Sequence, residues 1–521
     1  MTTATGQPAE RWWEEIRPQV SIVALFFVLM FALSLQNRVT DPDLWWHLRS
    51  GQWMLEEGRI PYTDPFSFTM AGRPWIAHSW LAEIAMYLLY RYIGAFSLPL
   101  LRSLLQVATL ALLLKMLWER WPRLWGNLGL LLACTLASTK FWLARPNSAS
   151  LALFVVVLYL WYLYKWRGRD RLWLLPPLMA FWANLHSGYV YGLLLLAVLW
   201  VAEPLAGRLW PDPVPLERRR WLRLGFFSLL AVPAVLLNPY GPRLLLYPFT
   251  YYFGSITLHT QFVGEWLSPN FHQFSNIVFM LLFLTLIAAL AWKRGAIGPA
   301  ETLGLLLFLA LALNSIRAAG VAIPFLTWSI AGVVGQGVLP RPAQARRGAW
   351  RPPTRTTVYI WYGGTLLLAL LLLSGVGFEY VTWGQTSGFL DESGYPRQAI
   401  PTLASLPPSA RIFNPYNWGG YLIWRLYPAR QVFIDGRADL YGDAVFEDYL
   451  QIAEARPNWA TLLIDKYRVD AVLCERQGPL ATVLAASPAW SAIYSDEQVM
   501  VFLPVDTRAA TSQGEISPWL K

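Results

Sequence analysis

The apolar run VSIVALFFVLMFALSL at residues 20–35 is followed a few residues later by the segment DPDLWWH at residues 41–47. The run has the composition of a membrane span, so the segment lies at a membrane boundary. Two carboxylates one residue apart, Asp41 and Asp43, are costly to desolvate there, and we expect them to face water, a metal ion or a cationic partner. The loop after the first span is therefore the leading candidate for an active site.

The composition of the whole chain is that of a polytopic α-helical membrane protein. Of its 521 residues, 55% are hydrophobic and only 14% are charged, and the mean hydropathy is +0.37. Apolar runs long enough to cross a bilayer recur until about residue 376, after which the chain reads as an ordinary soluble domain. The first run follows charged residues and has no small-residue cleavage site, so we interpret it as a retained span and not as a signal peptide.

The apolar runs predict about eleven membrane spans. They cover residues 20–37, 98–118, 127–143, 149–165, 172–184, 189–206, 222–238, 276–292, 298–314, 320–338 and 357–376. The fifth is short and contains Pro176 and Pro177, which favours a kinked or broken helix near residues 184–188. Broken helices in membranes usually line a cavity.

The charge pattern predicts the orientation of these spans. The net charge of +10 would suit a nucleic-acid partner, but the basic residues fall in five short loops and form no single surface, so no nucleic acid is expected. Such loops face the cytoplasm, together with residues 1–19, while the loop at 38–97 and everything after residue 376 lie outside. The basic residues are Arg120 and Arg123; Lys165, Arg167, Arg169 and Arg171; Arg208, Arg218, Arg219, Arg220 and Arg223; Lys293 and Arg294; and Arg341, Arg346, Arg347, Arg351 and Arg355.

The external loop at residues 38–97 contains two short segments, 44–57 and 79–92, that read as helices. Neither is long enough to span a bilayer, and counting the second as a span would invert every basic loop that follows. We therefore expect both to lie at the outer membrane interface. The tryptophans expected at headgroup depth are Trp45, Trp46, Trp53, Trp75 and Trp80.

Residues 377–505 have the pattern of an external α/β domain. Strand-length apolar runs at 411–413, 431–435, 470–474, 492–495 and 498–503 alternate with helical stretches at 420–426, 444–454, 459–466 and 480–486. Residues 506–521 read as a flexible tail. The two cysteines, Cys134 and Cys474, match no metal-binding spacing and form no disulfide framework, so we expect them to be inert packing residues.

The order of these parts resembles the GT-C superfamily of membrane glycosyltransferases. The likeness covers most of the chain: a first span, an external loop that opens with an Asp-x-Asp motif, many further spans and a carboxy-terminal α/β domain. The segment DPDLWWHLR at residues 41–49 is most similar to the first-loop motif of oligosaccharyltransferase catalytic subunits. The resemblance implies an inverting enzyme in a bacterial or archaeal cell membrane. Such an enzyme transfers a sugar from a polyprenyl-phosphate donor, on the external face, to a glycan, lipid or protein acceptor.

Asp43, with Asp41 beside it, is the predicted catalytic group that orients or deprotonates the acceptor. Hard carboxylate oxygens suit Mg²⁺ or Mn²⁺, and Glu265 is the best candidate for a third ligand of such an ion. Two alternatives stay open: Asp41 caps the helix that follows, and Glu265 is a solvated surface charge. The second acidic pair of the family is missing here, because the equivalent residues 145–148 contain no acid.

Arg317 and Arg145 stand at the outer ends of spans, where an unpaired cation is costly. The resemblance implies that such arginines bind the donor phosphate, and snorkelling to lipid headgroups is the alternative. The residues predicted to line the substrate cavity are His47, His78, His186 and Glu265. For His186, a buried structural hydrogen bond is the alternative.

The carboxy-terminal domain contains the candidate acceptor site. Residues 414–421, NPYNWGGY, resemble the aromatic-rich acceptor motif of oligosaccharyltransferases but lack its Trp-Trp-Asp core, so transfer to peptide sequons is not expected. The run FIDGRADLYGD at 433–443 is dense in acid and base, which is typical of acceptor or cation binding or, alternatively, of an Asp–Arg pair that fixes a loop. The candidate acceptor-binding residues are Trp418, Tyr421, Asp435, Arg437 and Asp439.

Two other classes of protein compete with the glycosyltransferase. A lipid or glycan transporter, such as a flippase, should carry ionisable residues near mid-span and two similar halves, and neither is evident in the sequence. A non-catalytic membrane scaffold with an external binding domain would tolerate the replacement of Asp43.

Overall fold

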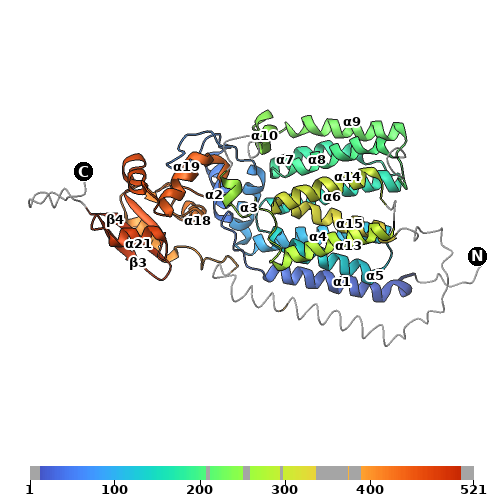
Figure 1. Ribbon diagram of the computed structural model, residues 1–521, viewed down its shortest axis with the longest axis horizontal. Coiled ribbons are helices and arrows are strands. Elements are labelled where there is room, and N and C mark those ends of the chain that lie inside the picture. Colours follow the sequence, from blue (N-terminus) through green and yellow to red (C-terminus); the bar gives the residue numbers. More distant parts are fainter. Residues whose placement is uncertain are drawn as a thin grey trace, which may run out of the picture.

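The computed structural model describes residues 12–206, 212–249, 258–293, 297–335, 374 and 389–505. Its long helices run side by side in one bundle, and the carboxy-terminal helices and strands gather at one end of it (Figure 1). Two short helices of the first loop, α2 (Leu44–Glu57) and α3 (Trp80–Ile93), lie between these two parts. The first loop is thus enclosed between the bundle and the carboxy-terminal region.

Within the described residues, the bundle has a helix at each predicted span up to residue 338. The bounds are α1 (Trp12–Gln36), α4 (Ser97–Arg120), α5 (Leu124–Ser138), α6 (Asn147–Arg167), α7 (Leu175–Leu185), α8 (Tyr189–Ala202), α9 (Arg218–Val235), α13 (Phe274–Trp292), α14 (Pro299–Asn314) and α15 (Ala319–Gly335). The predicted span at 357–376 lies outside the described residues, apart from Ser374. Among the residues that the structure describes, four stretches are long and apolar enough to cross a membrane: Ser97–Arg120, Asn147–Arg167, Phe274–Trp292 and Ile316–Gly335. The total number of spans stays a prediction.

Helices α15 and α13 show two environments within the bundle. Nearly every side chain of α15 is buried, so this helix forms the centre of the bundle. In contrast, α13 exposes large apolar side chains, among them Leu281, Leu284 and Ile287. An exposed apolar face of this kind is suited to contact with lipid tails.

The two prolines of the fifth predicted span do not break its helix. Pro176 and Pro177 lie in the first turn of α7, where a missing N–H removes no hydrogen bond of the helix. A 3₁₀ turn at Leu172–Leu174 precedes them. The helix ends at Leu185, and a short turn at residues 186–188 leads into α8. The helix is therefore interrupted near residues 184–188, as predicted, but the prolines are not the cause.

Helices α2 and α3 form at the predicted positions and pack closely against each other. Gly51 permits this approach, because a Cβ atom there would lie 2.2 Å from the carbonyl oxygen of Glu83. The expectation that the tryptophans of this loop lie at headgroup depth is wrong for four of the five. The side chains buried inside the protein are Trp45, Trp46, Trp53 and Trp75. They fill the core between α2 and its neighbours, where large aromatic groups bury the most apolar area.

The carboxy-terminal region contains a four-stranded sheet in the order β1-β2-β4-β3. Strands β1 (Ile412–Phe413) and β2 (Ala471–Glu475) are parallel, while β4 (Val499–Pro504) runs antiparallel to both β2 and β3 (Trp490–Ser495). The helices of this region are α17 (Ile400–Ser405), α18 (Tyr416–Leu426), α19 (Ala438–Ala453), α20 (Trp459–Thr461) and α21 (Pro479–Ala486). The strand predicted at 431–435 is wrong: Val432 makes only isolated bridges, to Ser67 and Ile412.

The first loop and the carboxy-terminal region are tied together by backbone and side-chain contacts. Val39 forms a parallel bridge with Leu390. The hydroxyl of Thr69 donates to the carbonyl oxygen of Phe433 at 2.6 Å. These contacts hold Leu390 and Phe433 of the carboxy-terminal region against the loop that carries Asp41 and Asp43.

The opposite end of the bundle contains buried ion pairs. Arg120 makes a bidentate contact with Glu301 at 2.8 and 3.0 Å and stacks over Trp328. Lys165 bonds Glu203 at 2.5 Å and also contacts Asp212. Both cations were predicted as orientation signals in cytoplasmic loops, but the structure buries them between helices. Which end of the bundle faces the cytoplasm stays a prediction. The two cysteines, Cys134 and Cys474, are buried and free, as expected.

Candidate active site

Two adjoining cavities lie where the bundle, the first loop and the carboxy-terminal region meet. The first has a volume of about 350 Å³ and reaches from the Asp41 loop to residues 416–439. The second, of about 410 Å³, lies toward the bundle and is lined by residues of its helices and connecting loops, such as Lys140, Ser150 and Val321. The residues that line both cavities are Arg145, Asn147, His186, Glu265 and Arg317.

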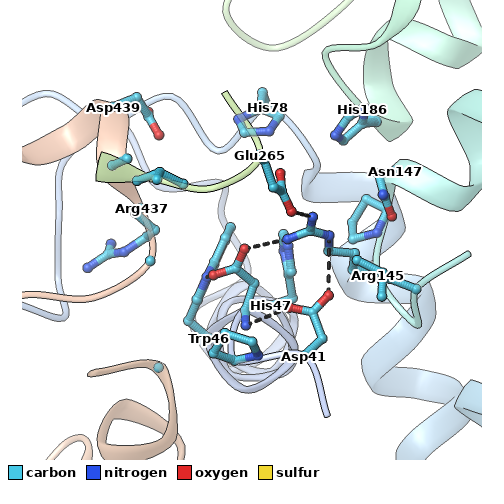
Figure 2. A pocket seen from close by; sticks show the side chains of 18 of the residues that line it. Asp41, Trp46, His47, His78, Arg145, Asn147, His186, Glu265, Arg437 and Asp439 are labelled. Atoms are coloured by element: carbon cyan, nitrogen blue, oxygen red, sulfur yellow. Dashed lines mark hydrogen bonds and ion pairs between the residues drawn. The ribbon is translucent and has the colours of Figure 1, made fainter. Parts of the chain in front are cut away.

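Arg145 is at the centre of this shared wall (Figure 2). Its Nη1 lies 2.7 Å from a carboxylate oxygen of Asp43, and its Nε lies 3.2 Å from Asp41. Its Nη2 forms a further ion pair with Glu265. The three carboxylates that the sequence singled out therefore converge on one guanidinium, although Glu265 is more than two hundred residues from Asp41 and Asp43 in the sequence.

The local sequence explains how the two aspartates are presented. Asp43 occupies the N-cap position of α2 but makes no capping bond with its side chain. Its carboxylate instead accepts the indole N–H of Trp46 at 3.2 Å. Asp41 accepts the backbone N–H of Asp43 at 3.0 Å, which shapes the turn before the helix. The alternative that Asp41 caps α2 is wrong, because Asp43 is at the N-cap position and no side chain makes a capping bond there.

Asp43 has the protonation behaviour of a base poised near neutral pH. Burial in the cavity wall raises the pKa of the Asp43 carboxyl to about 6, with Arg145 opposing and Asp41 reinforcing the shift. Its side chain nevertheless keeps 22% of its surface exposed, so it faces the cavity. Gly436, on the opposite wall, leaves room for this carboxylate, because a Cβ atom there would lie 2.0 Å from it.

His47 and Glu83 form a buried pair beside Asp43, with Nδ1 and Oε1 2.9 Å apart. Burial lowers the pKa of His47 well below its usual value and raises the pKa of Glu83 to about 8. Both shifts favour the neutral forms. Their contact is then a hydrogen bond between two neutral groups.

His186 lies in the turn between α7 and α8, and its hydrogen bonds define its tautomer. Its Nδ1 accepts the backbone N–H of Gly188 at 3.0 Å, and the hydroxyl of Ser150 lies 2.9 Å from the same nitrogen. The indole of Trp182 donates to that hydroxyl. Since a backbone N–H can only donate, Nδ1 carries no proton, and the neutral ring carries its proton on Nε2. Burial and the nearby His78 and Arg317 lower the pKa of His186 well below its usual value.

His78 stacks on Tyr247 with ring centroids 5.0 Å apart and meets the edge of His186 at 5.7 Å. Burial, together with Arg317, lowers the pKa of His78 to about 3. All three cavity histidines therefore stay uncharged at neutral pH. They offer neutral hydrogen-bonding groups beside the cationic side chains of Arg145 and Arg317.

The long loop that carries Glu265 is positioned by the segment around Arg317. The backbone N–H of Arg317 donates to the carbonyl oxygen of Glu265 at 3.1 Å, and Ile316 bonds Leu267 in the same way. The guanidinium of Arg317 lies 5.2 Å from the ring centroid of Trp266. These contacts hold Arg317 and Glu265 at the boundary of the two cavities.

Arg437 and Asp435 form a closed ion pair, which was one of the two interpretations of residues 433–443. Arg437 bonds Asp435 at 2.7 Å and Asp64 at 2.6 Å, and all three side chains are almost fully buried. The Tyr441 hydroxyl donates to Asp435 as well. Arg437 and Asp439 line the first cavity, whereas Asp435 does not.

The two aromatic candidates for acceptor binding lie outside both cavities. Trp418 donates its indole N–H to the carbonyl oxygen of Gly394 at 2.9 Å, and Tyr421 donates to Glu392. Both side chains are buried, and Tyr421 stacks on Tyr395. Their geometry is that of core packing, and their acceptor role stays a prediction without support from the cavities.

Sequence reasoning missed two residues of the site. Lys140 lines the second cavity and donates to Gln273 at 2.7 Å, but it falls inside a predicted span and was not considered. Lys140 could have been identified from its place near the end of that span, on the same side as Arg145. Gly436 was passed over between Asp435 and Arg437, and nothing in the sequence indicates that it faces Asp43.

The predicted metal ligands do not fit a metal ion in this arrangement. Within the described residues, no group of three or more His, Cys, Asp or Glu side chains is placed to hold one. Asp41, Asp43 and Glu265 do converge, but the guanidinium of Arg145 takes the position between them. A cation is therefore present at the expected place, supplied by the chain itself.

Comparison with known proteins shows the fold. No sequence-family model and no curated protein matches the chain. Among solved structures, the oligosaccharyltransferase of Archaeoglobus fulgidus in the apo form is 12% identical with a TM-score of 0.57, and 89% of this chain aligns with 70% of that one. The oligosaccharyltransferase AglB of the same organism, in complex with an inhibitory peptide and a dolichol-phosphate, is 10% identical with a TM-score of 0.53 and the same coverage. ArnT from Cupriavidus metallidurans bound to undecaprenyl phosphate is 14% identical with a TM-score of 0.48, and 96% of this chain aligns with 99% of that one.

The chain has a GT-C-like fold, and the resemblance found in the sequence is confirmed at that level. Its apolar helices have the length and composition of an integral membrane protein. The identities are too low to transfer an activity, so the function has to be argued from the site.

Proposed function

We propose that the protein is a membrane glycosyltransferase that moves a sugar from a polyprenyl-phosphate donor to an acceptor on the extracytoplasmic face. One observation carries the proposal: a carboxylate suited to act as a base and two arginines meet at the boundary of two adjoining cavities. Sugar transfer requires a base near the acceptor and a cation near the departing phosphate. Asp43 and Arg317 fit these two requirements.

Asp43 is proposed as the base that orients the acceptor hydroxyl and takes its proton. A pKa of about 6 leaves the Asp43 carboxyl ionised at neutral pH, yet basic enough to accept a proton. Arg145 and the indole of Trp46 fix its two oxygens. The geometry supports a single orientation of the attacking group.

Arg317 is proposed to hold the donor phosphate, with the neutral rings of His78 and His186 as further hydrogen-bond donors. A guanidinium matches the shape of a phosphate and remains charged at any working pH. The second cavity lies toward the apolar helices, which suits a lipid-linked donor, and the first reaches the carboxy-terminal region, which suits the acceptor. A dolichol-phosphate bound to the structural neighbour AglB supports a lipid-phosphate donor.

Cleavage of the donor tests the proposal directly. The purified protein, reconstituted into vesicles with a panel of radiolabelled polyprenyl-phosphate sugars and an extract of envelope glycans and lipids, should release free polyprenyl phosphate and label an acceptor. A flippase would move the donor between leaflets with its sugar bond intact, and a scaffold would do neither. Intact donor across the whole panel would contradict the proposed activity.

The rate of transfer should depend on the protonation of Asp43. Because burial raises the pKa of this carboxyl to about 6, the base is lost as the pH falls below that value. We expect kcat/KM to be flat near pH 7 and to fall about tenfold per pH unit below pH 6. A pH–rate profile from pH 4.5 to 8 checks this. The cavity histidines, whose pKa values are lowered, add no step in that range, and a rate that stays constant down to pH 5 would argue against Asp43 as the base.

His186 offers a test of the donor site through its tautomer. In His186→Gln, the amide nitrogen can take the place of Nε2 and still donate, whereas His186→Ala removes the donor. We expect kcat/KM for the donor to fall roughly 10- to 100-fold in His186→Ala, the cost of a hydrogen bond to a charged group, and only a few-fold in His186→Gln. His272, which is exposed and lines neither cavity, provides the control His272→Ala. Equal losses in the Gln and Ala variants would contradict the donor role.

A further inference from the structure

We propose that Arg145 is the resident cation of the reaction centre, standing in the position between Asp41, Asp43 and Glu265 where a divalent metal ion would otherwise be bound. The inference deepens the proposed function, on which it rests for the meaning of this centre. The ion pairs of Arg145 are seen in the structure and do not depend on the proposed function.

The guanidinium contacts all three carboxylates, with hydrogen bonds to Asp43 and Glu265 and an ion pair to Asp41. Nε, Nη1 and Nη2 each face a different carboxylate: Asp41, Asp43 and Glu265, in that order. The planar fork of an arginine can serve three acceptors in this way, which the ammonium of a lysine cannot do with the same geometry. Arg145 therefore fixes the relative positions of groups that come from the first loop and from the loop before α13.

A metal ion cannot share this position with Arg145. Mg²⁺ requires oxygen ligands at about 2.0–2.1 Å in a near-octahedral arrangement. The oxygens of Asp41 and Asp43 already lie 3.2 and 2.7 Å from the guanidinium nitrogens, and the Arg145 side chain is only 12% exposed. The guanidinium would have to leave before a metal could be bound by the three carboxylates.

The backbone around Arg145 does not favour such a movement. The hydroxyl of Ser148 donates to the carbonyl oxygen of Leu143 at 2.5 Å, and the Asn147 amide donates to Phe141. Pro146 fixes the backbone next to Arg145. The turn is thus anchored on both sides of the arginine, at the start of α6.

The inference predicts where a metal site would appear. Removal of the Arg145 side chain leaves three carboxylates without a counter-charge. In their present positions around the guanidinium they do not form a metal site, so the variant binds Mn²⁺ only when these side chains move together into the vacated space, where their oxygens suit that ion. Wild-type protein should bind no Mn²⁺ at sub-millimolar concentration, whereas Arg145→Ala should bind about one ion per chain. Adding Glu265→Gln to that variant should weaken Mn²⁺ binding roughly tenfold or more, because one charged ligand is lost.

The measurement is the loss of the free Mn²⁺ signal in electron paramagnetic resonance, with purified protein in detergent or nanodiscs. Arg317→Ala is the matched control, since it removes a cavity arginine without freeing the three carboxylates, and it should bind no Mn²⁺. Arg145→Lys retains a charge at the position and should bind at least tenfold less than Arg145→Ala. In the donor-cleavage assay, a chelator should leave the wild-type rate unchanged.

Two results would overturn the inference. Stoichiometric Mn²⁺ binding by the wild type, weakened by Glu265→Gln, would show that a metal and not Arg145 is the resident cation, and this measurement requires no Arg145 variant to fold. A folded Arg145→Ala protein that binds no Mn²⁺ would show that the carboxylates do not form a cation site. Neither measurement depends on activity. Failure of this inference, seen as Mn²⁺ binding, is therefore distinguished from failure of the proposed transfer, seen as intact donor in the cleavage assay.

Discussion

Asp43→Asn is expected to reduce sugar transfer by about 10²- to 10⁴-fold, the contribution of a well-placed general base. The amide is close in shape to the carboxylate and its oxygen can still accept the indole N–H of Trp46, but it cannot take a proton from the acceptor. Donor binding should change little, because the proposed phosphate contacts lie on Arg317. The rate of transfer and the affinity for a polyprenyl-phosphate sugar, measured on the same preparation, separate these two effects.

The matched control for this variant is Asp465→Asn, at an exposed position away from both cavities. It should leave the rate of transfer unchanged. If Asp43→Asn kept more than about a tenth of the wild-type rate, Asp43 would not be the base, and the proposed mechanism would have to be abandoned even if the protein cleaved its donor.

Arg437→Met is expected to lower the free energy of unfolding of the region around the first cavity by about 3–5 kcal/mol, because the buried carboxylates of Asp64 and Asp435 would lose their counter-charge. Thermal denaturation and limited proteolysis of the purified protein would detect the loss. Adding Asp64→Asn and Asp435→Asn to the variant removes the uncompensated charges and should restore part of the stability.

An exposed pair provides the comparison for Arg437. Arg456 contacts Glu454 at 2.6 Å, but both side chains are more than 40% exposed. Arg456→Ala should therefore change the stability by no more than about 1 kcal/mol. Equal destabilisation by both substitutions would mean that the burial of the Arg437 network contributes nothing to holding the cavity wall in place.

The arrangement of the helices followed from the sequence because the signals are local. Apolar length and basic loops predicted the helices of the bundle, and the short segments at 44–57 and 79–92 became α2 and α3. The tryptophans of α2 were assigned to the membrane interface because composition does not distinguish a headgroup contact from a contact with another part of the chain. In the structure, α2 contacts other parts of the chain, namely α3 and α18.

The site was predicted only in part, because its geometry depends on contacts between distant segments. Asp41, Asp43 and Arg145 were selected one by one from their place at the ends of predicted spans, and Glu265 from its place in a long external loop. It could not indicate that Arg145 pairs with the three acids, and so this arginine was assigned to the donor phosphate. The strand predicted at 431–435 is wrong for a similar reason. Its apolar residues are buried, as in a strand, but the segment makes only isolated bridges with distant residues.

The wall opposite Asp43 is built from residues 436–439, which are synthesised long after the acidic loop and the helices of the bundle. A nascent chain that has inserted its bundle but has not yet reached these residues therefore has its acidic loop without the facing wall. The pocket is completed only after residue 439 has been synthesised, so the order of synthesis itself delays the chemistry.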